Sequence, residues 1–120
     1  MNKGGFSVTE IKDGKICVVT FGETLDSRFD AGFTEMISLR IEEGQRFFLF
    51  DFRYTQIVQS PAVASILESA NLIAESKKRV LSCCNMSEML ENIFEMVGLF
   101  MFSSHFNDEH LAIEGFGDYE

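Results

Sequence analysis

A serine hydroxyl lies at the start of a predicted helix, after a buried apolar run and a short polar connector. The residues concerned are Gln59, Ser60 and Pro61. Ser60 is a favoured N-cap residue, because its hydroxyl can accept a hydrogen bond from an unpaired backbone N–H of the first turn. Pro61 suits the first helical position, where its missing N–H costs nothing. The sequence therefore predicts a structural cap at Ser60. A second hypothesis is an anion or nucleotide phosphate held at this helix N-terminus.

Other residue types capable of nucleophilic or metal chemistry are present but are not spaced for it. His105 and His110 are five residues apart, whereas two metal ligands on one helix face are three or four apart. The serine at the helix start has no Gly-x-Ser-x-Gly context. The cysteines lack the Cys-x-x-Cys spacing and are expected to be free and buried; they are Cys17, Cys83 and Cys84. We therefore expect no catalytic residue, no metal site and no cofactor.

Two carboxylates, Asp51 and Asp30, are candidates of a different kind. Asp51 ends the buried run of residues 47–52. A carboxylate in such a place can be catalytic or can bind a metal, but it more often accepts hydrogen bonds from the next loop or from a helix N-terminus. We therefore predict a structural role for both.

The strands that must position these residues are short apolar or β-branched runs. The first two form a hairpin over residues 6–21, because Asp13-Gly14 supplies the two positive φ angles of a tight turn. The central run is apolar at nearly every position, as expected when helices cover both faces of a sheet. The remaining predicted strands are residues 47–52, 80–84 and 99–102.

Helices are predicted between the strands from apolar residues at i, i+4, i+7 and i+8. The first covers residues 29–41, with Gly44 just past its end. The second follows Ser60 and ends before three basic residues at 77–79, which suit the helix dipole. Its predicted buried positions are Val63, Ile66, Leu67, Ala70, Ile73 and Ala74. The third begins with a capping box of Asn85 and Glu88 and ends at Gly98. Residues 103–108 are expected to form a loop that leads to a short helix or an extended tail.

The order ββαβαβαβ predicts the fold class. We expect one domain over residues 1–120. Its fold is α/β, with a mixed four- to five-stranded sheet, parallel in its middle, an N-terminal antiparallel hairpin and helices packed on the sheet.

Composition and charge limit the class of partner. The net charge is −9 and the sequence pI is about 4.6. An acidic surface disfavours binding to nucleic acid and to an anionic membrane, whereas it is compatible with a basic protein. No run of about 18 apolar residues is present, so we expect no transmembrane helix. Residues 1–5 precede no apolar segment typical of a signal peptide, so a cytoplasmic location is expected.

The order and spacing of these segments resemble the STAS domain, the module shared by anti-sigma factor antagonists and the cytoplasmic tails of sulfate transporters. The family loop reads Asp-Ser-Ser-Gly-Leu-Gly between a strand and a helix. The corresponding stretch here is Gln59-Ser60-Pro61-Ala62-Val63-Ala64. Residues 6–21 resemble the family's opening hairpin, residues 95–100 its late helix end, and residues 107–113 its closing segment. The resemblance covers nearly the whole chain and implies the STAS fold.

The resemblance also implies a function. Anti-sigma factor antagonists are non-enzymatic and bind an anti-sigma factor that is a serine kinase. The implied partner-binding residues here are Gln59, Ser60 and Pro61, together with Ser65 and Glu68, which we expect to be exposed on the following helix. The family's phosphoacceptor serine aligns with Pro61, which has no hydroxyl, so phosphorylation is not expected at that position. Ser60 is the possible phosphoacceptor that remains.

Alternatives remain open. The chain is also compatible with a STAS subunit of a transporter complex, or with a domain that binds a small molecule or a nucleotide phosphate. A homodimer is possible on the sequence alone.

Overall fold

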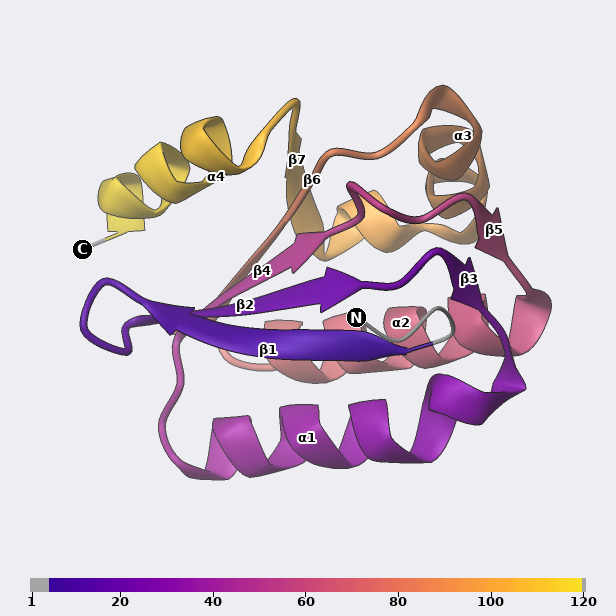
Figure 1. Ribbon diagram of the computed structural model, residues 1–120. Coiled ribbons are helices and arrows are strands. Elements are labelled where there is room, and N and C mark those ends of the chain that lie inside the picture. Colours follow the sequence, from indigo (N-terminus) through magenta and orange to yellow (C-terminus); the bar gives the residue numbers. More distant parts are fainter. Residues whose placement is uncertain (1–4, 120) are drawn as a thin grey trace.

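A five-stranded sheet forms the centre of the structure, a computed structural model that describes residues 5–119 without the side chains of residues 29–31 (Figure 1). The sheet order is β1-β2-β4-β6-β7. The pair β1–β2 is antiparallel and the other neighbours are parallel. The strands are β1 (Phe6–Ile11), β2 (Ile16–Phe21), β4 (Phe47–Asp51), β6 (Val80–Cys84) and β7 (Ser103–Phe106). The predicted mixed sheet with an N-terminal antiparallel hairpin is confirmed.

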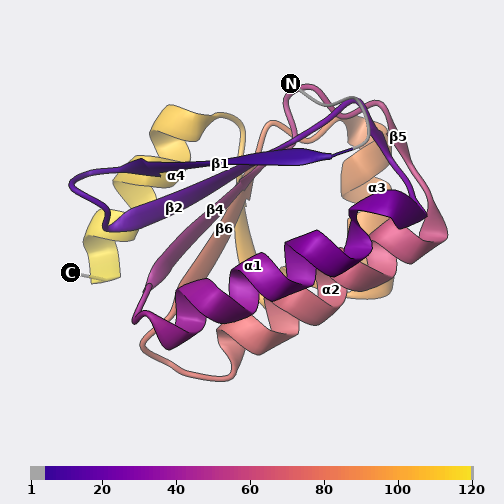
Figure 2. The ribbon, with the colours of Figure 1, turned by 60° about the horizontal axis from the view of Figure 1, so that its bottom comes forward.

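Helices cover both faces of this sheet. Figures 1 and 2 place α1 (Asp30–Glu42) and α2 (Ser60–Ala74) on one face and α4 (Glu109–Phe116) on the opposite face. The helix α3 (Glu88–Val97) follows β6. Single 3₁₀ turns are η1 (Ser27–Phe29), η2 (Leu99–Met101) and η3 (Gly117–Tyr119). A second, two-stranded parallel sheet joins β3 (Thr24–Leu25) to β5 (Ile57–Val58).

Each face of the main sheet has its own apolar cluster, because successive residues of a strand point to opposite sides. The larger cluster lies under α1, α2 and α3 and is rich in phenylalanine. Within it the rings of Phe21 and Phe52 stack with centroids 4.6 Å apart. The smaller cluster lies under α4 and consists of Ile16, Val18, Phe47, Leu49, Cys84, Ala112 and Phe116. The helix α4 therefore supplies the cover of the second face.

Turn residues at two places behave as the sequence predicts. In the hairpin turn, Asp13 and Gly14 have φ angles of 57° and 81°, and the preceding Lys12 also has a positive φ of 56°. Gly98, with φ of 88°, ends α3, and its N–H bonds to the carbonyl oxygens of Phe94 and Glu95. A glycine is favoured there because a side chain in this backbone conformation is strained.

The last strand of the sheet differs from the prediction. The apolar residues 99–102 were expected to form it, but Leu99–Met101 is the 3₁₀ turn η2, and its Leu99 is buried in the larger cluster. The strand is instead the polar stretch Ser103–Phe106, which pairs with β6 alone. An edge strand does not need two apolar faces, so its sequence lacks the apolar run of a central strand. The segment that follows is the helix α4, not an extended tail.

Candidate functional site

The loop that leads from β4 to α2 is held by hydrogen bonds to the segment between β2 and β3. Thr55 is buried, and its Oγ1 donates to the Gly22 carbonyl oxygen at 2.9 Å. The N–H groups of Gln56 and Ile57 bond to the Glu23 carbonyl oxygen, at 2.8 and 3.1 Å. The loop is therefore fixed along its length, and it presents the start of α2 in a defined position.

The start of α2 corrects the predicted cap. The N-cap is Gln59, because its carbonyl oxygen already accepts from the N–H groups of Ala62 and Val63. Its own N–H bonds to the Leu25 carbonyl oxygen at 2.8 Å, which continues the β3–β5 pairing into the helix entry. Ser60 is consequently the first residue of the helix and Pro61 the second. The predicted cap at Ser60 is therefore wrong.

The Ser60 side chain is exposed and forms no hydrogen bond within residues 5–119. Gln59 and Pro61, its neighbours, are exposed as well. The three side chains thus form one surface at the N-terminus of α2, with a hydroxyl that is available to a partner.

Ser65, which was expected to be exposed, is buried with 4% of its surface accessible. Its hydroxyl donates to the Pro61 carbonyl oxygen one turn earlier, at 3.1 Å. The buried face of α2 is Ala62, Ser65, Ile66, Ser69, Ala70 and Ile73. The small side chains on this face permit close packing of the helix on the core. Ala74, which was also predicted to be buried, is exposed. Glu68 is exposed as predicted, on the same face as Ser60 and Ala64 at i, i+4 and i+8.

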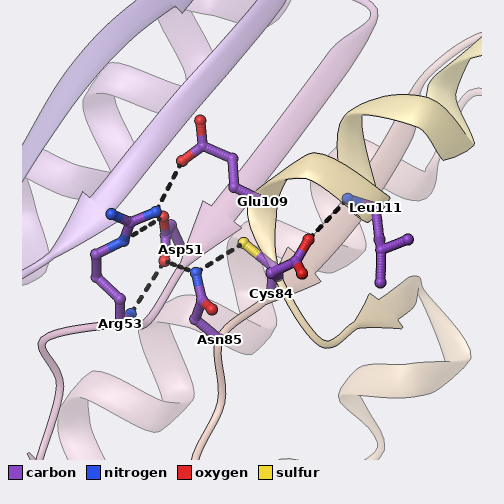
Figure 3. A network of polar contacts seen from close by, with 7 residues as sticks. Asp51, Arg53, Cys84, Asn85, Glu109 and Leu111 are labelled. Atoms are coloured by element: carbon purple, nitrogen blue, oxygen red, sulfur yellow. Dashed lines mark hydrogen bonds and ion pairs between the residues drawn. The ribbon is translucent and has the colours of Figure 1, made fainter.

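A second group of polar side chains lies at the carboxyl ends of β4 and β6 (Figure 3). Asp51 is only 1% exposed. Its Oδ1 accepts from the backbone N–H of Arg53 and from Nδ2 of Asn85, both at 3.0 Å. Its Oδ2 accepts from Nε of Arg53 at 3.2 Å, and Nη2 of Arg53 in turn donates to Oε2 of Glu109 at 3.2 Å. This group, which we call the Asp51 cluster, joins two strand ends to α4.

The Asp51 cluster raises the pKa of two of its members: the charge of Asp51 raises that of Arg53, and Glu109 is shifted in the same direction. Burial raises the pKa of Glu109, and a hydrogen bond to Asp51 and the charge of that carboxylate raise it further, while the charge of Arg53 opposes them. The carboxylate oxygens of Asp51 already accept hydrogen bonds from Arg53 and Asn85, and the side chain is buried. The geometry therefore supports the predicted structural role of Asp51. The side chain of Asp30 lies outside the described residues.

Asn85 was expected to cap α3 and instead belongs to the Asp51 cluster. It has a positive φ of 59°, and the N-cap of α3 is Ser87, whose hydroxyl accepts from the N–H of Leu90 at 3.2 Å. One sequence signal could have found this cluster: Asp51 and Asn85 each stand at the end of a predicted central strand. Carboxyl ends of neighbouring parallel strands meet at one edge of a sheet.

Residues suited to nucleophilic or metal chemistry are not brought together. His105 contacts Glu91, and Nε2 of His110 lies 3.1 Å from Oε2 of Glu114 on its own helix. Burial raises the pKa of the Cys83 thiol to about 12 and moves that of Cys84 in the same direction, so neither forms the reactive thiolate at neutral pH. Among the side chains that the structure describes, no three of His, Cys, Asp or Glu are placed to hold a metal ion. In the same range no helix has the length and apolar character needed to cross a bilayer.

Solved structures of other proteins share this arrangement of strands and helices. The anti-sigma factor antagonist SpoIIAA in its unphosphorylated form has a TM-score of 0.76 and 17% identity, over 93% of this chain and 96% of that one. SpoIIAA, a Bacillus cell fate determinant, in its phosphorylated form has a TM-score of 0.73 and 19% identity, over 91% and 96%. The inward-facing murine Solute Carrier 26 family member A9 anion transporter has a TM-score of 0.65 and 12% identity, over 98% of this chain and 22% of that one.

No protein-family model and no curated protein matches the sequence. At identities of 12–19% the structural likeness shows the fold alone. The STAS fold expected from the sequence is therefore confirmed.

Proposed function

We propose that this chain is a non-enzymatic cytoplasmic signalling protein of the anti-sigma factor antagonist type. It binds a regulatory serine kinase through Gln59, Ser60, Pro61 and Glu68. The observation that carries the proposal is that these four side chains are exposed together on the first turns of α2, while the loop before them is held by backbone hydrogen bonds. A preorganised surface binds with a smaller loss of conformational entropy.

The buried position of Ser65 changes the extent of the proposed surface. Ala64 replaces it, since Ser60, Ala64 and Glu68 follow one another at intervals of four residues on the exposed face. The surface therefore has a neutral start at Gln59 and a single carboxylate two turns later. The partner therefore binds a surface whose loop end, at Gln59, carries no charge.

Ser60 is the acceptor that we propose if the loop is phosphorylated. Its hydroxyl is exposed and forms no hydrogen bond in the described part of the chain. Thr55 and Ser65 are buried, with hydroxyls that donate to carbonyl oxygens. A phosphate adds a charge of about −1.5 to −2 and would repel an acidic partner surface.

A second candidate function is a STAS subunit of a transporter complex. The observation in its favour is the likeness to a 22% portion of the Solute Carrier 26 family member A9 anion transporter. In that case the partner is a transporter, and the serine kinase does not bind.

The test of binding is calorimetric titration of the purified chain with anti-sigma serine kinases encoded in the same genome. We expect Glu68→Arg to weaken binding at least tenfold, because it reverses the one charge of the surface, and Gln59→Asp to change the affinity without changing the circular dichroism spectrum. The matched control is Glu35→Arg, another exposed glutamate in mid-helix, on α1. Equal affinities for the wild type and both surface variants would place the interface elsewhere.

The test of the acceptor is incubation with such a kinase and ATP, followed by peptide mass spectrometry. We expect phosphate on Ser60 alone and none on the Ser60→Ala variant. Stoichiometric phosphate on Thr55 or Ser65 would contradict the assignment.

A further inference from the structure

An apolar stripe runs along the outward side of α3 and continues past its end. Its residues follow the spacing i, i+4, i+7 and i+8 of one helix face; they are Met89, Ile93, Met96 and Val97. Met96 is 87% exposed and Met101, in η2, is 83% exposed. The Met101 sulfur lies 3.5 Å from the position that a side-chain carbon on Gly98 would occupy, so this side chain covers the end of α3. We call these five residues the methionine stripe.

Packing of α3 on the core does not explain the methionine stripe. The buried residues of the helix are Leu90 and Phe94. The Phe94 ring contacts the Phe52 ring with centroids 5.3 Å apart, and this contact anchors the helix on the larger cluster. The stripe thus leaves Met96 and Met101 largely in water and Met89 and Val97 about half exposed, while Ile93 is partly buried. Such a contiguous exposed patch is typical of an interaction surface.

Acidic side chains line one side of the methionine stripe. Glu88, Glu91 and Glu95 are spaced at i, i+3 and i+7, so they form a row on the same helix, and the exposed Asn92 lies between this row and the stripe. Glu91 contacts His105, whereas Glu88 and Glu95 form no ion pair within residues 5–119. The side of α3 that faces solvent therefore carries a negative row and an apolar row on the two sides of Asn92.

This pattern is complementary to one kind of occupant. A basic amphipathic helix has an apolar row next to a positive row, and it can place both against α3 at once. A second copy of the chain, or an anionic bilayer, would bring negative charge against the glutamates in a chain whose net charge is already −9. Methionine side chains are flexible and polarisable, so they adapt to apolar side chains of different shape.

We propose that the methionine stripe and its glutamate row bind a basic amphipathic helix of a partner protein. The ten residues of α3 span about 15 Å, so the bound segment has roughly three to four turns. The surface is separate from the start of α2, although Figures 1 and 2 place α3 beside β5, which leads into α2. Neither proposal depends on the other.

The test uses an 18-residue leucine–lysine amphipathic peptide and the isotope-labelled full chain. We expect the amide shifts of residues 88–101 to change on titration. Glu88→Gln combined with Glu95→Gln should reduce both the affinity and its dependence on salt. Met96→Gln combined with Met101→Gln should weaken binding at least tenfold. Both methionines are more than 80% exposed, so the variant should fold, and circular dichroism checks this.

The matched control is Leu39→Gln, a half-exposed leucine on α1 near Glu35 and Glu43, which should leave the affinity unchanged.

Four results would overturn the proposal. One is equal binding of a leucine–glutamate peptide, and another is shift changes centred on α1 or α4. A third is unchanged affinity in the double methionine variant. The fourth is a dimer in light scattering that Met96→Gln dissociates, since it would show that a second copy covers the stripe. The shift map on the wild-type chain needs no variant, so the test stands even if a variant fails to fold.

Discussion

Asp51 joins three segments of the chain through one carboxylate. Its oxygens accept from the Arg53 backbone and side chain and from Asn85, and Arg53 extends the contact to Glu109 on α4. Because the carboxylate is buried, its removal leaves donors without the partner that satisfied them.

We expect Asp51→Ala to lower the free energy of unfolding by about 1–3 kcal/mol, since the freed donors become unsatisfied. Urea melts of the variant and the wild type measure this difference. The control is Asp118→Ala, which removes an exposed carboxylate and should leave the midpoint unchanged. Identical melts for Asp51→Ala and the wild type would mean that water satisfies these donors.

Glu109 should make the stability of the fold depend on pH. Its pKa is raised in the folded chain by burial, by the hydrogen bond to Asp51 and by that residue's charge. The folded state therefore holds the proton more tightly than the unfolded state. As pH rises from the ordinary pKa of a glutamate to the raised pKa, the free energy of unfolding should fall.

Glu109→Gln should remove this fall, because the amide does not titrate and can still donate to Asp51. Urea melts between about pH 4 and pH 7 compare the two proteins. Glu114→Gln, an exposed residue of the same helix, should follow the wild-type curve. If the free energy of unfolding changed with pH in the same way in the wild type and in Glu109→Gln, the prediction would be wrong.

The helices α2 and α3 begin in different ways, and the difference can be measured. The Ser87 hydroxyl caps α3 by accepting from the Leu90 N–H, whereas the Ser60 hydroxyl is free within the described chain and α2 starts at Gln59. We expect Ser87→Ala to lower the free energy of unfolding by about 0.5–2 kcal/mol. Ser60→Ala should change it by less than about 0.5 kcal/mol. Urea melts of both variants decide the matter, and a larger loss for Ser60→Ala would reverse the assignment of the caps.

Element order and type could be predicted because they depend on local patterns. The apolar run at Phe47–Asp51, the Asp13-Gly14 turn and the helix end at Gly98 each follow from a few adjacent residues. The STAS-like arrangement of strands and helices followed from their order.

The exact helix start, the burial of Ser65 and the identity of the last strand depend on the rest of the molecule. The start of α2 is set by the bond from the Gln59 N–H to Leu25, a residue distant in sequence. Ser65 is buried because α2 turns its small side chains inward. The strand β7 could not be recognised from a polar sequence that pairs on one side only. The Asp51 cluster needed the register of β4 and β6 to bring Asp51 and Asn85 together.

At the scale of the whole molecule, α4 closes the second face of the sheet by a close approach to β7. A side-chain carbon on Gly115 would lie 2.7 Å from Cζ of the Phe106 ring, which is too short for a contact. Gly117, by contrast, has open space around it and a φ of −59°. The packing of α4 on the edge strand β7 thus depends on the glycine at position 115 and not on the one at position 117.

We expect Gly115→Ala to lower the free energy of unfolding by about 1 kcal/mol or more, because α4 or the Phe106 ring must move. Gly117→Ala should raise it by about 0.4–1 kcal/mol, since alanine restricts the unfolded chain without a clash. Thermal melts of the two variants provide the comparison. Equal effects of the two substitutions would show that Phe106 yields without cost.

The phenylalanine-rich core has a consequence for optical spectroscopy. The chain has no tryptophan, and its two tyrosines are Tyr54, in the loop before β5, and Tyr119, after α4. They are 50% and 52% exposed, so both phenols emit from the surface and neither reports on the packed interior. A Tyr119→Phe variant would retain a single tyrosine, Tyr54, a few residues before the start of α2. Quenching of the Tyr54 emission would therefore report the docking of a partner at the start of α2, and no dye would have to be attached to the chain.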